Sequence, residues 1–173
     1  MYETEEDIAE LQALIDRSYS QAGKHLVAIH DPTRRVPAVR VADRLQGMCL
    51  LVLATVTADG RPLTGPVDGI FYRGSFYFGS SPDSVRFRHI GKRPQVSATH
   101  LPGEEFAVSV HGHAEVIELA DPATRDFQDA RMGVYRSIYG DDFDYPGGVT
   151  ARIVADRFFA FNLEPTPPNN ADR

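Results

Sequence analysis

The sequence has one cysteine, no long apolar run and a shortage of basic residues. The lone Cys49 excludes an internal disulfide and a multi-cysteine zinc site, so we expect a buried and inert thiol. The longest apolar run, residues 48–54, is about seven residues, whereas a membrane-spanning helix needs roughly twenty. The acidic first ten residues do not resemble a signal peptide. We therefore expect a cytoplasmic protein with no membrane contact.

The charge balance also narrows the possible partners. The chain has 18 Lys and Arg against 24 Asp and Glu, a net charge of -6. Nucleic-acid binding needs clustered basic side chains to neutralise phosphates, so we expect no nucleic-acid partner. The sequence has neither a Gly-x-Ser-x-Gly elbow nor a Gly-x-Gly-x-x-Gly fingerprint, which argues against a serine hydrolase and a Rossmann site.

Helical signals lie in the N-terminal part of the chain and between the later strands. Thr4 precedes an acidic turn and an apolar stripe, which predict a helix over residues 5–22. Residues 23–37 have the composition of a connection, and a short helix follows over residues 38–46. Two later helices are predicted, one over 84–90 capped by Asp83, and one opened by Asp121-Pro122 with the apolar stripe Phe127, Ala130, Val134 and Ile138.

The remaining sequence predicts short strands joined mostly by hairpin turns. These strands cover residues 49–57, 62–72, 75–79, 95–101, 106–119 and 151–163, the first of them apolar enough to be buried on both faces. This pattern predicts a mainly β fold with flanking helices, an antiparallel six-stranded split β-barrel. We expect a helical extension over 1–47, the barrel over 48–163 and a disordered tail over 164–173. A homodimer would cover sheet edges and enlarge a small core.

One strand-to-helix junction has the chemistry of an anion site. An aromatic strand ends at Ser80 and Ser81, and the next helix begins with Ser84, Arg86 and Arg88. Hydroxyls, a helix N-terminus and a guanidinium all suit a phosphate group. The alternative is a capped surface helix with solvated arginines. The carboxylate of Asp83 would compete for the same backbone N–H groups.

An ordered set of short segments resembles the pyridoxamine 5′-phosphate oxidase-like split-barrel proteins. The set comprises residues 53–62 (LATVTADGRP), residues 64–67 (TGPV), Tyr77-Phe78, and the serine and basic helix that ends at Arg93-Pro94. The resemblance covers roughly residues 45–120, and the last strand more weakly. It implies an FMN cofactor at a subunit interface.

The resemblance also implies particular cofactor residues. In that family a strand-end hydroxyl and a helical Ser-Arg-Lys hold the FMN phosphate. Here Ser80 and Ser84 match the hydroxyls, Val85 replaces the motif's Arg, and Arg86 replaces its Lys. Neighbouring Ser81 and Arg88 are further candidates, with Arg88 as a partial substitute for the lost basic group. The residues implied along the flavin ring are Thr55, Val56, Pro66 and Val67.

The end of the sequence departs from the true oxidases, whose substrate-binding pattern closes with Arg-Leu-x-Pro. Here it reads FNLEPTPP over residues 161–168, so we do not expect vitamin-B6 oxidation. We expect an FMN-dependent oxidoreductase that transfers hydride to or from an unidentified small molecule. The alternatives are an 8-hydroxy-5-deazaflavin-dependent reductase and a non-catalytic flavin- or haem-binding protein. No catalytic residue is predicted, although Asp68, Tyr135 and Tyr139 are candidates on the substrate side.

Two histidines, His111 and His113, share one face of a predicted strand. That spacing suits a metal, with His100 or Glu115 as a third ligand, and haem-binding relatives of the barrel keep axial ligation open. The same spacing is found in solvent-facing or interface pairs. We expect no metal site.

Overall fold

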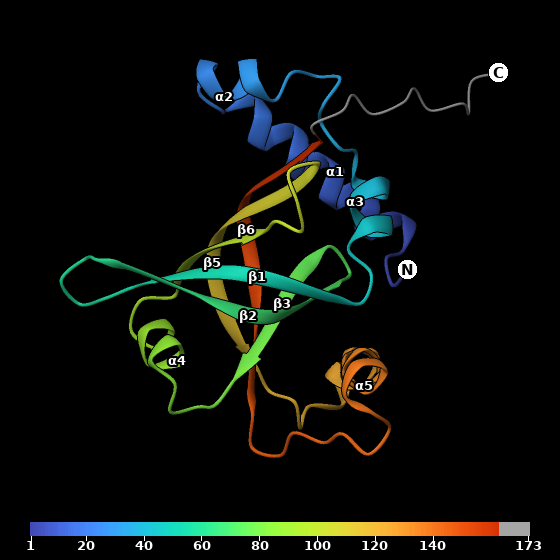
Figure 1. Ribbon diagram of the computed structural model, residues 1–173, viewed down its shortest axis with the longest axis vertical. Helices are drawn as coiled ribbons and strands as arrows, with labels where there is room; N and C mark the ends of the chain where they lie inside the picture. Colours follow the sequence, from blue (N-terminus) through green and yellow to red (C-terminus); the bar gives the residue numbers. More distant parts are fainter. Residues whose placement is uncertain (163–173) are drawn as a thin grey trace.

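The six strands form one closed antiparallel barrel in the order β1-β2-β3-β6-β5-β4 (Figure 1). This computed structural model describes residues 1–162, so the predicted tail over 164–173 lies outside the described residues. The barrel confirms the predicted split-barrel fold. Its strands are β1 Met48–Val56, β2 Pro62–Tyr72, β3 Ser75–Ser80, β4 Gln95–His100, β5 Phe106–Ile117 and β6 Val149–Asn162.

The helices lie at the two ends of this barrel. In Figure 1, α1 to α3 are at one end, while α4 and α5 are towards the other. The connection predicted over 23–37 is not wholly irregular, because residues 24–29 form the short helix α2. The bounds are α1 Glu5–Ser20, α2 Lys24–Ile29, α3 Ala38–Arg44, α4 Val85–Ile90, the 3-10 turn η1 Pro122–Thr124 and α5 Arg125–Tyr139. None of these helices is long and apolar enough to cross a membrane.

The first helix begins where its capping residues predict. Thr4 Oγ1 accepts a hydrogen bond from the Asp7 backbone N–H, and the Asp7 carboxylate accepts one from the Thr4 N–H at 2.8 Å. This reciprocal capping box satisfies two amides that the helix leaves unpaired. Asp7 also accepts from Arg73 Nε at 3.0 Å, which ties the start of α1 to the β2–β3 turn.

The apolar run over residues 49–57 was predicted to be buried on both faces. The exposure of its side chains in β1 shows that this prediction was wrong. Cys49, Leu51 and Leu53 point into the barrel and are at most 2% exposed. Leu50 and Val52 point outward and are 62% and 53% exposed. A barrel encloses only one face of each strand, and apolarity alone does not reveal which side remains open. The outward side of β1 is therefore an apolar surface.

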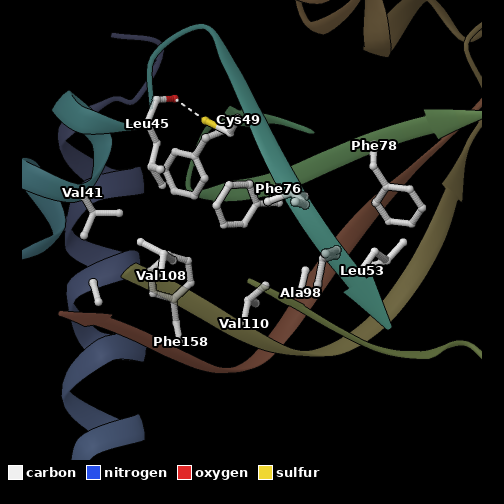
Figure 2. Packing of buried hydrophobic residues seen from close by; sticks show 14 of the residues in the cluster. Val41, Leu45, Cys49, Leu53, Phe76, Phe78, Ala98, Val108, Val110 and Phe158 are labelled. Atoms are coloured by element: carbon white, nitrogen blue, oxygen red, sulfur yellow. Dashed lines mark hydrogen bonds between the residues drawn. The ribbon is translucent and has the colours of Figure 1, made fainter. Parts of the chain in front are cut away.

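The barrel interior is filled mainly by aromatic and branched side chains (Figure 2). Phe76 and Phe158 stack with ring centroids 6.4 Å apart, and Phe71 packs edge-on to Phe76 at 5.0 Å. Cys49 closes one end, where its Sγ donates to the Leu45 carbonyl at 3.6 Å. Burial raises the pKa of the Cys49 thiol to about 12, as expected of an inert side chain.

Helix α1 is fixed to β6 by buried hydrogen bonds. Ser18 Oγ donates to the Leu14 carbonyl at 2.6 Å and accepts from the Phe158 backbone N–H at 2.9 Å. The Tyr19 hydroxyl donates to the Ala160 carbonyl at 2.9 Å. The N-terminal helices and the barrel therefore share one core.

Replacing Ser18 tests this attachment. Ser18→Ala leaves the buried Phe158 N–H without its acceptor, so we expect a loss of roughly 1–3 kcal/mol in the free energy of unfolding. Urea denaturation measures it. Ser20→Ala is the matched control on the same helix, because its hydroxyl is exposed and bonds only to the Arg17 carbonyl. Equal, small effects of the two variants would contradict the role given to Ser18.

Candidate functional site

Helix α4 packs against β1 and reaches, through Arg86, the part of β2 that is not paired with β3. The paired residues of these strands run over Gly69–Tyr72 on β2, and the earlier half of β2 faces α4. Phe87 and Ile90 anchor α4 because both are buried. Its cap is Ser84, whose Oγ accepts from the Phe87 N–H at 3.3 Å. The prediction of Asp83 as the cap was wrong, because the helix begins at Val85, which puts Ser84 and not Asp83 at the capping position.

The guanidinium of Arg86 joins three elements at one point. Its Nη1 donates to Ser80 Oγ at the end of β3, at 3.5 Å. Its Nη2 donates to the Pro66 carbonyl of β2, at 3.1 Å. A side chain at Gly65 would meet Nη2 at 3.4 Å, so the glycine leaves room for the guanidinium over the strand. Three of the sequence-predicted site residues, Ser80, Arg86 and Pro66, therefore meet.

This guanidinium is a half-buried charge with neutral partners. Burial lowers the pKa of Arg86, yet arginine stays protonated at any physiological pH. Among residues 1–162, no carboxylate forms an ion pair with it. A partly desolvated cation without a counter-charge is unfavourable on its own, and an anion placed beside it relieves that cost. The geometry therefore defines a candidate anion site, which we call the Arg86 anchor (Arg86, Ser80 and the Pro66 carbonyl).

A cavity of about 290 Å³ lies on the α4 side of the Arg86 anchor. Thr55 is buried in its wall, and its hydroxyl lies 2.9 Å from His89 Nδ1 of α4, within hydrogen-bond distance. The wall is mixed, with apolar side chains beside backbone and hydroxyl groups. This α4 cavity is lined by Leu53, Thr55, Leu63, Thr64, Gly65, Val85 and Arg86.

The other predicted cofactor residues do not reach the Arg86 anchor with their side chains. Arg88 is exposed and donates to the Asp83 carbonyl at 2.6 Å, and Ser81 is exposed on the preceding turn. Val67 is 6% exposed and packs in the core. The Val56 carbonyl accepts from Arg93 Nε at 2.9 Å. The sequence alone did not show which of the predicted cofactor residues lie at the Arg86 anchor and which lie elsewhere.

A second cavity, of about 320 Å³, lies between α5, the middle of β2 and the end of β3. It brings together the three substrate-side candidates Asp68, Tyr135 and Tyr139, which come from distant parts of the sequence. It also contains two residues that sequence reasoning missed, Phe143 and Tyr145, because their Gly- and Asp-rich segment was interpreted only as a loop. This α5 cavity is lined by Asp68, Gly79, Ser80, Tyr135, Tyr139, Phe143 and Tyr145.

The two histidines of β5 have separate partners. His111 Nδ1 lies 2.9 Å from Ser97 Oγ, and His113 Nε2 lies 3.5 Å from the Glu115 carboxylate. His100 Nδ1 lies 2.9 Å from the Leu50 carbonyl. Over residues 1–162, no group of three or more His, Cys, Asp or Glu side chains is arranged to hold a metal ion.

Comparison with models of known protein families identifies the family to which this chain belongs. The model of the pyridoxamine 5′-phosphate oxidase family matches residues 38–162, so the chain belongs to this family. This match includes the six strands, the Arg86 anchor and both cavities. Comparison with curated protein sequences gives no match.

Solved structures share the fold at low sequence identity. The conserved hypothetical protein Rv2991 from Mycobacterium tuberculosis is 19% identical, with a TM-score of 0.64 over 83% of this chain and 99% of that one. An FAD-binding protein from Mesorhizobium loti is 18% identical, with a TM-score of 0.57 over 76% and 99%. An F420 reductase is also 18% identical, with a TM-score of 0.50 over 66% and 91%.

The hydrogen bond between Thr55 and His89 offers a test of how α4 is held. Thr55→Val keeps the shape of the side chain but removes the hydroxyl, so we expect a loss of roughly 1–2 kcal/mol in the free energy of unfolding. Thr64→Val is the control, because Thr64 is exposed on the adjacent strand. Thermal unfolding of both variants measures the difference. A Thr55→Val protein as stable as the control would show that α4 does not depend on this bond.

Proposed function

We propose that this protein is an FMN-dependent oxidoreductase of the pyridoxamine 5′-phosphate oxidase-like superfamily. The observation that supports it is the Arg86 anchor, a half-buried cation that has neutral partners and adjoins two cavities. The FMN phosphate would accept from the Arg86 guanidinium and from the hydroxyls of Ser80 and Ser84. Ser84 Oγ already accepts from Phe87 N–H and still has its own proton to donate.

The residues around the Arg86 anchor fit a flavin phosphate in charge and in hydrogen-bonding capacity. A bound flavin supplies hydride chemistry at its ring, so the protein needs no acid–base pair for that step. Leu53, Leu63 and Val85 of the α4 cavity would exclude water from a bound ring. The substrate of the proposed reaction is a small molecule that shares the site with the cofactor.

The second candidate cofactor is an 8-hydroxy-5-deazaflavin, as the F420 reductase of the same fold suggests. The observation that favours it is the exposed Arg88 on the same helix as Arg86, because a second basic side chain suits the larger, anionic tail of a deazaflavin. Val85 stands where the family motif has Arg, and this missing basic group favours instead a protein without turnover. A flavin- or haem-binding protein without turnover is the non-catalytic alternative, in which FMN binds but no acceptor is reduced.

The proposal includes a homodimer with the cofactor at the subunit interface. Leu50 and Val52 form an exposed apolar ridge on β1, and Pro66 lies directly across the strand pair from Val52. Contiguous exposed apolar surface is typical of interaction sites. Since the Pro66 carbonyl also belongs to the Arg86 anchor, the ridge adjoins the proposed cofactor. The proposal places the protein in the cytoplasm, where the free thiol of Cys49 stays reduced.

Removing the guanidinium should weaken FMN binding. For Arg86→Ala we expect a loss of about 1.5–3 kcal/mol in binding free energy, the range of a hydrogen bond to a charged group. Calorimetric titration with FMN measures it, and Arg88→Ala is the matched control because that arginine points away. Unchanged affinity in a folded Arg86→Ala protein, or an equal loss in Arg88→Ala, would exclude the proposed phosphate site.

A charge on the ridge should separate the subunits. Val52→Lys places an ammonium on the proposed interface, so we expect the dimer dissociation constant to rise at least roughly tenfold in sedimentation experiments. Val39→Lys is the matched control, because Val39 is 44% exposed and lies on helix α3, outside the proposed ridge. A wild-type monomer, or a Val52→Lys dimer as tight as the control, would refute this interface.

A further inference from the structure

The inward side of β1 ends on a polar side chain. The inward residues before it, Leu51 and Leu53, are apolar, but the next one is Thr55, which is only 4% exposed. A buried hydroxyl is unfavourable unless it is hydrogen-bonded, and a valine of similar shape would avoid that cost. In the described part of the chain, the one hydrogen-bond partner of this hydroxyl is His89 Nδ1, at 2.9 Å.

His89 contacts Thr55 from the face of helix α4 that also carries Arg86. The two α4 residues are three positions apart, which places their side chains on the same side of a helix. Arg86 and Thr55 both line the α4 cavity, whereas His89 does not. His89 therefore acts on a molecule in this cavity only through the hydroxyl of Thr55.

The charged side chains around His89 are directed elsewhere. Arg88 and Arg93 donate to backbone carbonyls at 2.6 and 2.9 Å, and Lys92 is exposed. Among residues 1–162, no carboxylate forms an ion pair with His89. The contact with Thr55 is thus the interaction that fixes the position of the imidazole ring.

A hydrogen bond between a hydroxyl and an imidazole can run in either direction. If Nδ1 of His89 carries a proton, it donates to Thr55 Oγ1, and the threonine proton is free for a molecule in the α4 cavity. If Nδ1 carries none, Thr55 donates its proton to His89 and offers the cavity only an acceptor. The proton on Nδ1 therefore sets whether the cavity presents a donor or an acceptor at this position.

We propose that His89 is a positioning residue that carries a proton on Nδ1 and so makes the Thr55 hydroxyl a hydrogen-bond donor to the flavin ring in the α4 cavity. The inference rests on the proposed function, which places the ring there. An oxidised flavin ring presents mostly acceptors, namely its carbonyl oxygens and ring nitrogens, so a donor is the polarity that matches it. Arg86 then recognises the phosphate, and the pair of Thr55 and His89 recognises the ring.

Two replacements of nearly equal shape at position 89 test this polarity. His89→Asn can still donate to Thr55 from its amide, whereas His89→Asp can only accept there and takes the threonine proton. Riboflavin, which has the ring without the phosphate, is titrated calorimetrically into both variants. We expect His89→Asn to bind within about threefold of wild type and His89→Asp to bind at least about fivefold more weakly. Equal affinities of the two variants would overturn the assignment.

The threonine hydroxyl must carry this difference. In a Thr55→Val background, the two variants at position 89 should bind riboflavin within about twofold of each other, because no hydroxyl is left to orient. A difference that persists there would assign the effect to the aspartate charge and refute the positioning role. The control for added charge is His25→Asp, on an exposed residue of α2 at the other end of the molecule (Figure 1), which should leave binding within about twofold.

A spectroscopic measurement on the wild-type protein does not depend on the folding of any variant. The nitrogen NMR shifts of labelled histidines show which ring nitrogen carries a proton, and His89 is assigned through its backbone. The spectrum is recorded at about pH 8.5, above the usual range of histidine titration. We expect a proton on His89 Nδ1 in the riboflavin complex. An unprotonated Nδ1 in that complex would overturn the proposal.

The same titrations keep this inference separate from the proposed phosphate site. FMN binding that depends on Arg86 but not on the polarity at position 89 would overturn the inference and leave the proposed function standing. Riboflavin binding with the expected dependence on position 89, in a protein whose Arg86→Ala variant binds FMN normally, would support the inference and exclude the phosphate site. A protein that binds neither flavin would overturn both.

Discussion

The functional interpretation depends on one constraint, the position of the Arg86 guanidinium. It is held half-buried between a serine hydroxyl of β3 and a backbone carbonyl of β2, with no carboxylate paired to it within residues 1–162. Water and neutral acceptors stabilise such a cation less well than an anion does. The separation of β2 from β3, the packing of α4 and the glycine at position 65 all serve to place it there.

The helices before the barrel contribute to stability through the last strand. Ser18 and Tyr19 bond to the backbone of β6, and Leu11 and Ile15 belong to the same core as the barrel residues. β6 pairs with β3, whose final residue is Ser80. The N-terminal segment thus supports, through two strands, the element that ends at the Arg86 anchor. We propose this support as the role of the extension over residues 1–47.

Much of the fold could be predicted because its signals are local. Turn residues and strand-forming runs defined six strands, and Thr4 and Pro37 marked helix starts. The exposed side of β1 could not be predicted, since Leu50 and Leu51 are equally apolar and only closure of the barrel separates them. The site was predictable in part. Ser80 and Arg86 lie six positions apart across one turn, whereas the α5 cavity joins Asp68 to residues more than sixty positions later, which no local pattern reveals.

The most direct test of the Arg86 anchor compares FMN with riboflavin, which has the same ring system and lacks the phosphate. Both are titrated into the purified protein at low ionic strength, and the dissociation constants are compared. The account predicts that FMN binds at least roughly tenfold more tightly, because only its phosphate meets Arg86. Equal affinity for the two ligands, or no binding of FMN, would contradict it.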